Sequence, residues 1–193
     1  MLTEVAIGAV IHNDVLTISI RQGNELAEPI QAKLGNPLDA VALLLAERVR
    51  HRHDDPIIYL ESNSTAGAVL EGIRERDEQS RDQIVNGLSG AASYAGAGVA
   101  FYDRRSELHY RFLERVAHGK LLVPAVYNDQ LIAFSEEIKD GKIFFPYVRD
   151  VAQKLGRWPA FAITAVLATL DVPPRRDDGA ASRRDHDPYA KLT

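Results

Sequence analysis

The chain opens with two mainly apolar runs that are typical of β-strands. Residues 4–11 read EVAIGAVI and residues 15–23 read VLTISIRQG, and the trio between them, His-Asn-Asp, is prone to form turns. The pattern predicts an antiparallel hairpin. A spacer that contains Gly35 and Pro37 separates this hairpin from the next element.

The spacing changes to that of a helix at residue 37. Apolar residues recur at positions 38, 41, 42, 45 and 49, and Asp39 suits the N-cap or first turn of such a helix. Residues 57–61, IIYLE, follow as a short buried strand, which we expect to be parallel and central. The segment NSTAG then turns into a second helix over residues 68–79.

Helical patterns dominate the second half of the chain. The expected elements are, in order, a short strand and a loop of small residues over 83–103, a helix over 104–119 that Gly119 caps, a short strand or turn over 120–124, a helix over 129–141, an extended segment over 142–147 and a last helix over 147–170 that Pro159 interrupts. From Pro173 onward apolar residues are scarce, so we expect residues 1–172 to form one domain and residues 173–193 a disordered tail.

Composition narrows the class of protein. Of the 193 residues, 46% are apolar and 26% are charged, which is ordinary for a soluble globular protein. No apolar run is long enough for a membrane span and the start does not resemble a secretory signal, so we expect no membrane partner and a cytoplasmic location. The absence of Cys excludes disulfides and thiolate metal sites. The net charge of −4 argues against a protein coated in nucleic acid, although basic residues can still line one groove.

The order of elements predicts an α/β fold. A leading antiparallel hairpin followed by βα units is typical of an RNase H-like mixed sheet flanked by helices. In that architecture, carboxylates on the first strand, the central strand and a late helix hold two metal ions that clamp a phosphodiester.

Four stretches carry a resemblance to a known family. They are IIYLESNSTAGAVLEGIRER over 57–76, FYDRRSELHYRFLERVAHGKLLVP over 101–124, DQLIAFSEEIKDGKIFFP over 129–146 and KLGRWPAFAITAVLAT over 154–169. In this order they resemble the C-terminal nuclease domain of phage terminase large subunits, the DNA-packaging motor proteins. The last stretch is similar to that family's closing pattern, Gly-Arg-Ser-Pro-Asp, one residue, then Ala-Asp-Ala. The resemblance runs from about residue 5 to residue 170.

The resemblance implies a degenerate acidic site. It places the family's first-strand Asp on Ala9, the central-strand acid on Glu61, and the helix acids on Ala160 and Ile163. One carboxylate binds Mg²⁺ weakly and cannot hold two ions, so we expect impaired cleavage. If the protein is active, Glu61 is a metal ligand, Asp14 in the hairpin turn is a second catalytic acid, and Mg or Mn is the cofactor; otherwise there is none. Helix-capping is the structural alternative for Glu61.

Several basic residues are candidates for DNA binding. The resemblance favours phosphate contacts for Arg104 and Arg105, and Lys154 and Arg157 lie near the helix that carries the family's acids. The alternative is a solvated helix face paired with Glu107 and Glu114. A last group, RVRHRH over 48–53, is explained more simply as a basic helix end.

Three functions therefore remain open from the sequence. The first is a terminase nuclease-like domain in viral DNA packaging that binds double-stranded DNA or the motor and cuts poorly. The second is an active Mg- or Mn-dependent endonuclease, and the third is a non-catalytic phage assembly protein. Because no G-x-x-x-x-G-K-[ST] motif is present, ATP hydrolysis is expected from a terminase ATPase domain or subunit, with the portal as a further partner, in a bacterial host cell. The chain is then a split gene product or an excised domain, with natural or engineered loss of the acids.

Overall fold

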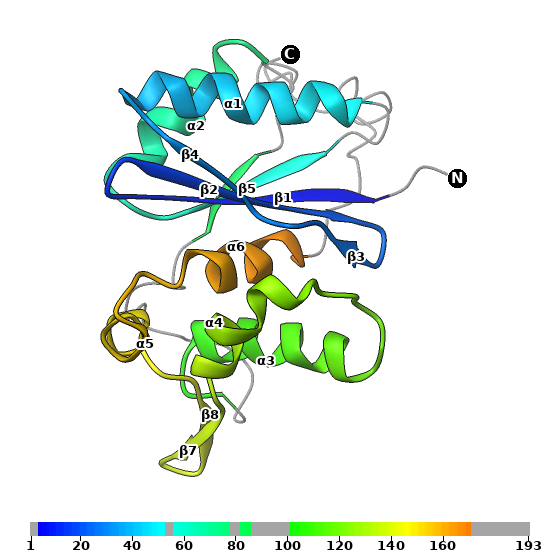
Figure 1. Ribbon diagram of the computed structural model, residues 1–193, viewed down its shortest axis with the longest axis vertical. Coiled ribbons are helices and arrows are strands. Elements are labelled where there is room, and N and C mark those ends of the chain that lie inside the picture. The colour runs from blue at the N-terminus through cyan, green and yellow to red at the C-terminus, as the bar shows by residue number, and fades with distance from the viewer. Residues whose placement is uncertain (1–3, 53–55, 78–81, 86–100, 171–193) are drawn as a thin grey trace, which may run out of the picture.

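The computed structural model describes residues 4–52, 56–77, 82–85 and 101–170. Its elements stack in layers (Figure 1): α1 and α2 cover one face of a mixed sheet, α6 crosses the other face, and α3, α4, α5 and the β7–β8 hairpin lie beyond α6. The strands are β1 (Val5–His12), β2 (Val15–Gln22), β3 (Glu25–Leu26), β4 (Ile30–Lys33), β5 (Ile57–Glu61), β6 (Gln83–Val85), β7 (Glu137–Lys139) and β8 (Lys142–Phe144). The helices are α1 (Pro37–Arg50), α2 (Ala66–Arg74), α3 (Arg104–Ala117), α4 (Asn128–Ala133), α5 (Val148–Leu155) and α6 (Ala160–Ala168), with a 3₁₀ turn, η2 (Ala125–Tyr127).

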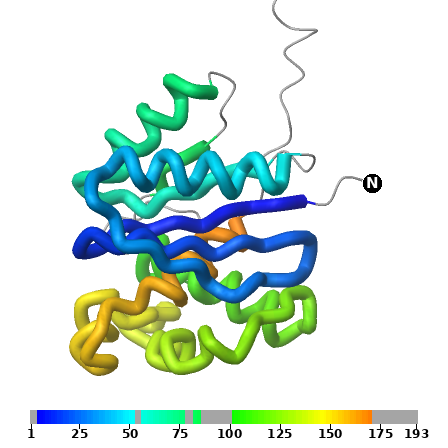
Figure 2. Tube along the Cα trace, turned by 45° about the horizontal axis from the view of Figure 1, so that its top comes forward, coloured from blue at the N-terminus to red at the C-terminus, as the bar shows by residue number. Residues whose placement is uncertain are grey.

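The main sheet has the order β3-β2-β1-β5-β6, with β4 also paired to β2. Strand β1 is antiparallel to β2 and parallel to β5, which is parallel to β6. The predicted hairpin and the central parallel strand are both confirmed. Asn13 and Asp14 form the hairpin turn at φ of 48° and 59°, the left-handed pair that matches the twist of the strands. The tube in Figure 2 shows this hairpin, in dark blue, beside the helical layer of α1 and α2.

Two predicted segments differ from the structure. The helix expected over 129–141 ends at Ala133 and gives way to the β7–β8 hairpin, whose turn holds Asp140 and Gly141 at φ of 51° and 71°. The spacer before α1 contains β3 and β4. The predicted interruption of the last helix is confirmed, since Gly156 ends α5 in the left-handed conformation and Pro159 precedes α6. The expected tail over 173–193 lies outside the described residues, so its disorder stays a prediction.

Two apolar clusters lie on the two faces of the sheet. One fills the space between the sheet and the helices α1 and α2, and the other surrounds α6. In α6, every residue from Ala162 to Ala168 is buried, because the helix has the sheet on one side and α3 and α4 on the other. Gly8 permits this close approach: a Cβ at that position would overlap the carbonyl oxygen of Thr164 and lie 2.6 Å from the amide nitrogen of Ala168.

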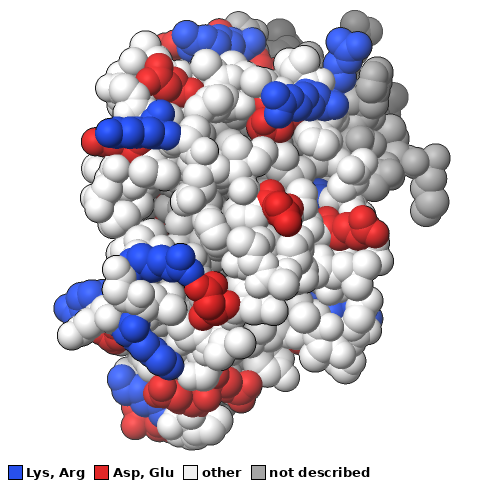
Figure 3. Space-filling model, viewed as in Figure 1, with Lys and Arg blue, Asp and Glu red and all other residues white. Residues whose placement is uncertain are grey.

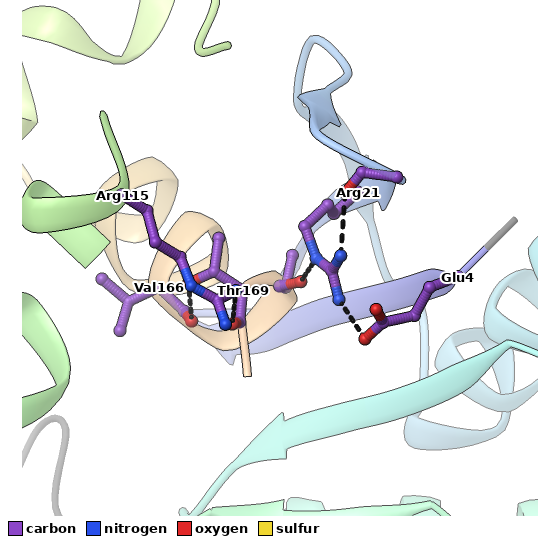
Figure 4. A network of polar contacts seen from close by, with 7 residues as sticks. Glu4, Arg21, Arg115, Val166 and Thr169 are labelled. Carbon is purple, nitrogen blue, oxygen red and sulfur yellow. Dashed lines mark hydrogen bonds and ion pairs between the residues drawn. The ribbon is translucent and has the colours of Figure 1, made fainter. Parts of the chain in front are cut away.

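Polar contacts fix α6 at its C-terminal end. Arg21 of β2 donates from Nε to the carbonyl of Ala168 at 2.8 Å, and Arg115 of α3 donates to the carbonyl of Thr169 at 2.8 Å (Figure 4). Both cations lie where the helix dipole favours positive charge, and both satisfy carbonyls that have no partner inside the helix. They attach α6 to the sheet and to α3 at once. None of the described helices combines the length and apolar character that a bilayer crossing requires.

Candidate functional site

The end of the sheet beside α6 is where the predicted acids should meet. Glu61 ends β5 and shares a face with Ile57 and Tyr59, which belong to the cluster around α6. The β1–β5 register pairs Ala9 with Leu60, so the next residue of β1, Val10, comes beside Glu61. Val10 also belongs to the α6 cluster. A group of catalytic side chains is therefore expected on this face of the sheet.

Ala9 is not on that face. Its side chain is fully buried in the cluster under α1 and α2, because successive residues of a strand point to opposite faces. A carboxylate at position 9 would point away from both α6 and Glu61. The residue of β1 beside Glu61 that faces α6 is Val10, so a first-strand acid able to meet Glu61 would stand at position 10 and not at position 9. The site lacks an acid there in either case.

The N-terminal turn of α6 is apolar and has a neutral cap. Ala160 is 7% exposed and Ile163 is completely buried. Their helix has no acidic residue in its first turn. Instead, the buried side chain of Gln130 in α4 accepts hydrogen bonds from the backbone N–H groups of Phe161 and Ala162, at 2.8 and 3.3 Å. An amide thus satisfies the helix N-terminus at the place where the resemblance would put carboxylates.

Glu61 is the acid that the resemblance leaves at this end of the sheet, and it is only 2% exposed. The capping role considered for it is filled by Asn63, whose side chain accepts from the N–H groups of Thr65 and Ala66 at 2.9 Å each. Asn63 also donates to the carbonyl of Ile11 at 3.0 Å and so ties the turn after β5 to the end of β1.

The residues present do not fit a divalent metal pair. Asp14 is exposed in the hairpin turn, beyond the end of the paired strands. Within the described part of the chain, no group of three or more His, Asp and Glu side chains is arranged to hold a metal ion. Val10, Ala160 and Ile163 are apolar, so among the described residues these positions offer no hard oxygen ligand of the kind that Mg²⁺ needs. No cleavage step through a metal can be derived from this arrangement.

An aromatic pair occupies this end of the sheet instead. The rings of His12 and Trp158 stack with centroids 4.1 Å apart and planes 7° from parallel. His12 lies two residues beyond Val10 on the same strand, so it points to the α6 face. Burial lowers the pKa of His12, which keeps the imidazole neutral near pH 7. No sequence pattern predicts this pair; the one signal is that Trp158, the single Trp of the chain, stands where the family pattern has Ser.

A pocket of about 250 Å³ opens beside the stacked pair. Its lining comes from the hairpin, from β4 and from the approach to α6: His12, Asn13, Val15, Thr17, Gln31, Trp158 and Ala160. The amide of Gln31 donates to the hydroxyl of Thr17 at 3.1 Å. The Nε1 atom of Trp158 is buried and has no hydrogen-bond acceptor among the described residues.

The predicted DNA-binding residues divide into one buried and three exposed side chains. Arg105 is fully buried, donates to Asp103 at 2.7 Å and to the carbonyl of Phe145 at 2.8 Å, and lies 4.1 Å from the ring centre of Tyr147. Burial lowers its pKa, and Asp103 and Tyr147 oppose that shift. The DNA-binding prediction for Arg105 is therefore corrected to a role inside the fold.

The other three candidates, Arg104, Lys154 and Arg157, are exposed and able to reach a phosphate. Arg157 also pairs with the exposed Asp129. The alternative of a charge-paired helix face applies to Arg111, which pairs with Glu107 at 2.5 Å.

The basic group over 48–53 is structural in its described part. Arg48 of α1 pairs with Asp77 at 2.8 Å and with the buried Asp82, and Arg50 pairs with Glu47 at 2.5 Å. The Arg48 contacts join α1 to the segments around β6, and the Arg50 contact lies within α1. They support the simpler interpretation of this group as a basic helix end.

Comparison with known proteins identifies the fold. No protein-family model and no curated protein sequence matches the chain. The nuclease domain of the large terminase subunit gp2 of bacterial virus Sf6 matches with a TM-score of 0.64 at 12% identity, over 90% of this chain and 90% of that one. A variant of the Sf6 domain with manganese matches with a TM-score of 0.64 at 14% identity, over 86% and 87%. The large terminase nuclease of the thermophilic phage G20c with bound magnesium gives 0.57 at 16%, over 86% and 80%.

These matches cover at least 86% of this chain and at least 80% of each neighbour. The chain therefore has the fold of phage large-terminase nuclease domains, and the predicted RNase H-like architecture is confirmed.

Proposed function

We propose that this protein acts in viral DNA packaging as a terminase nuclease-like domain that holds double-stranded DNA and does not cleave it efficiently. One observation carries the proposal: Val10, Ala160 and Ile163 are apolar, buried members of the cluster on the face of the sheet to which Glu61 belongs. In-line cleavage by two metals needs a cluster of carboxylates, and the described residues hold none. We accordingly propose no resident Mg or Mn.

Exposed cations support the DNA-binding part of the proposal. Arg104 begins α3, and Lys154 and Arg157 flank the turn between α5 and α6. All three belong to the half of the molecule beyond the α6 face of the sheet (Figure 1). An ATPase domain or subunit is a further proposed partner, because the chain has no nucleotide-binding P-loop motif. The packaging setting also implies the portal as a partner and the cytoplasm of a bacterial host as the location.

A salt titration tests DNA binding. Affinity for a fluorescent duplex should fall steeply with salt, because each phosphate contact releases counterions and contributes about 0.9 to the log–log slope. Replacing Arg104, Lys154 and Arg157 together by Ala should reduce the slope by about 3. The matched control replaces Arg50, Arg52 and Arg74, which are exposed on the α1–α2 side, and should leave the slope unchanged. Binding that is absent at low salt, or equal in both variants, would contradict the proposal.

A purely structural assembly protein is the second candidate. Figure 3 favours it in one respect: on the described part of the face shown, acidic and basic side chains are interspersed and form no continuous basic band. The same titration separates the two candidates, because an assembly protein without a DNA role would show no duplex binding at low salt.

A further inference from the structure

We propose that the pocket beside His12 and Trp158 binds an unstacked nucleobase of a DNA single strand or frayed end. The inference deepens the proposed function and rests on it, since it names the ligand that the end of the sheet beside α6 binds.

The pocket has the size and the aromatic wall that a base requires. Its volume of about 250 Å³ suits one heterocycle with its sugar rather than a bare ion. Two of its lining side chains, His12 and Trp158, are already held parallel at a centroid separation of 4.1 Å. A preformed aromatic surface favours a flat ring over an aliphatic chain, because every base has a π-face that stacks on aromatic side chains.

Hydrogen-bonding groups at the pocket match the edge of a base. Gln31 has an amide that both donates and accepts, and it is held toward the pocket by its bond to Thr17. The buried indole N–H of Trp158 has no acceptor among the described residues, and a buried donor without a partner is destabilising. The neutral imidazole of His12 adds no positive charge against a base.

Exposed cations close in the chain to the lining residues could contact the phosphates that accompany a base. Lys33 lies two residues beyond Gln31 on β4, so it is on the same face of the strand, and it is exposed. Arg157 directly precedes Trp158, and Lys154 is in the last turn of α5. An apolar peptide side chain would use the aromatic wall but neither the amide nor the cations. The combination therefore favours a nucleotide.

The single Trp provides the measurement, because all tryptophan fluorescence of the chain reports on Trp158. We expect a short oligothymidylate to quench it with saturation, an abasic oligomer of the same length to leave it nearly unchanged, and free thymidine monophosphate to quench at higher concentration. His12→Ala should weaken oligothymidylate binding about tenfold, and His12→Phe, which keeps a ring, should restore most of it. The control His118→Ala, at an exposed histidine that ends α3, should bind like the parent.

The outcomes separate this inference from the proposed function. Equal quenching by the abasic oligomer, or no quenching by oligothymidylate, overturns the base pocket, even if the duplex still binds. Loss of duplex binding overturns the proposed function, whereas saturable, base-dependent quenching that His12→Ala weakens and His12→Phe restores supports the pocket. Circular dichroism of each variant, expected to match the parent, shows that a change in quenching does not come from unfolding.

Discussion

His12 of β1 and Trp158 of the α5–α6 turn lie in parallel contact, with ring centroids 4.1 Å apart, on the face of the sheet that Val10 and α6 share. Such an aromatic pair contributes about 0.5–1.5 kcal/mol beyond the area it buries. Together with the apolar residues Val10, Ala160 and Ile163, the pair makes this end of the sheet part of the hydrophobic core. Apolar and aromatic contacts therefore attach α6 to this end of the sheet.

Restoring the acids should create a metal site. In the double variant Val10→Asp with Ala160→Asp, two carboxylates join Glu61 on one face, and the acid at residue 160 also suits a helix N-terminus. We expect Mn²⁺ to raise the melting temperature of this variant and not that of the parent. A free ion at one hundred times its Kd stabilises the fold by about 2.7 kcal/mol. The control Ala160→Asp alone should respond much less, and an unresponsive double variant would contradict the proposed geometry of the site.

Substitution of Gly8 should be severely destabilising. An Ala at this position places its Cβ against the carbonyl of Thr164 and 2.6 Å from the amide nitrogen of Ala168, so α6 must move away from the sheet. We expect Gly8→Ala to lower the free energy of unfolding by about 2–3 kcal/mol, measured by urea denaturation. Gly67→Ala is the matched control, because no atom lies within 4 Å of a Cβ there and Ala favours the helix, by about 0.5–1 kcal/mol. Equal stabilities of the two variants would contradict the close packing of α6.

Substitution of two neighbouring arginines of α3 by Ala should change stability to very different extents. Arg105→Ala removes a buried cation that bonds to Asp103 and Phe145 and leaves the acid without this partner, so we expect a loss of about 3–5 kcal/mol in unfolding free energy. Arg104→Ala, at an exposed site, should change stability by less than about 0.5 kcal/mol. Its effect should appear in duplex affinity instead. Denaturation and anisotropy measured on both variants check the assignment, which fails if Arg104 proves the more destabilising of the two.

Stability should depend on pH through His109. Burial lowers the pKa of His109 to about 3, and the nearby Arg105 acts in the same direction, whereas an unfolded histidine titrates near 6.5. Below pH 6.5 the unfolded chain binds a proton that the folded chain refuses, so stability falls by about 1.4 kcal/mol per pH unit down to about pH 3.

Removing the imidazole tests this contribution. His109 stacks on Phe134 at a centroid distance of 4.3 Å, so His109→Phe keeps an aromatic ring in the same place. We expect the unfolding free energy of the variant to decline less than that of the parent between pH 7 and pH 5 (roughly the start of the window). The exposed His118→Gln should keep the parent slope. Parallel pH profiles of the parent and His109→Phe would show that the ring titrates normally in the fold.

Local patterns in the sequence predicted the elements that local chemistry determines. The His-Asn-Asp trio gave the β1–β2 hairpin, and the apolar spacing of residues 38–49 gave α1, whose N-terminus is closed by a capping box of Asn36 and Asp39. The β7–β8 hairpin was missed, although Asp140 and Gly141 are a strong turn pair, because the residues before them also suit a helix. Where a short segment has both a helical pattern and a turn pair, tertiary contacts decide whether it forms a helix or a hairpin.

Prediction of the site required information that no local pattern contains. Residues 9 and 10 point to opposite faces of the sheet, and only the β1–β5 pairing and the packing of α6 show which of them faces that helix. Likewise, Arg104 and Arg105 are adjacent in the sequence, yet one is exposed and the other is completely buried under Tyr147. The prediction of impaired cleavage, by contrast, rests on the residue types at positions 9, 160 and 163 alone.

Plasmid nicking in Mn²⁺ tests the central claim most directly. The purified protein is incubated with supercoiled plasmid beside Glu61→Gln, which keeps the shape of the side chain and removes its charge. We predict no nicking above background by either protein, with retention of the plasmid on a gel at low salt. Nicking by the parent that disappears in Glu61→Gln would contradict the account, because it would show that other acids complete the site and that the domain is a working nuclease.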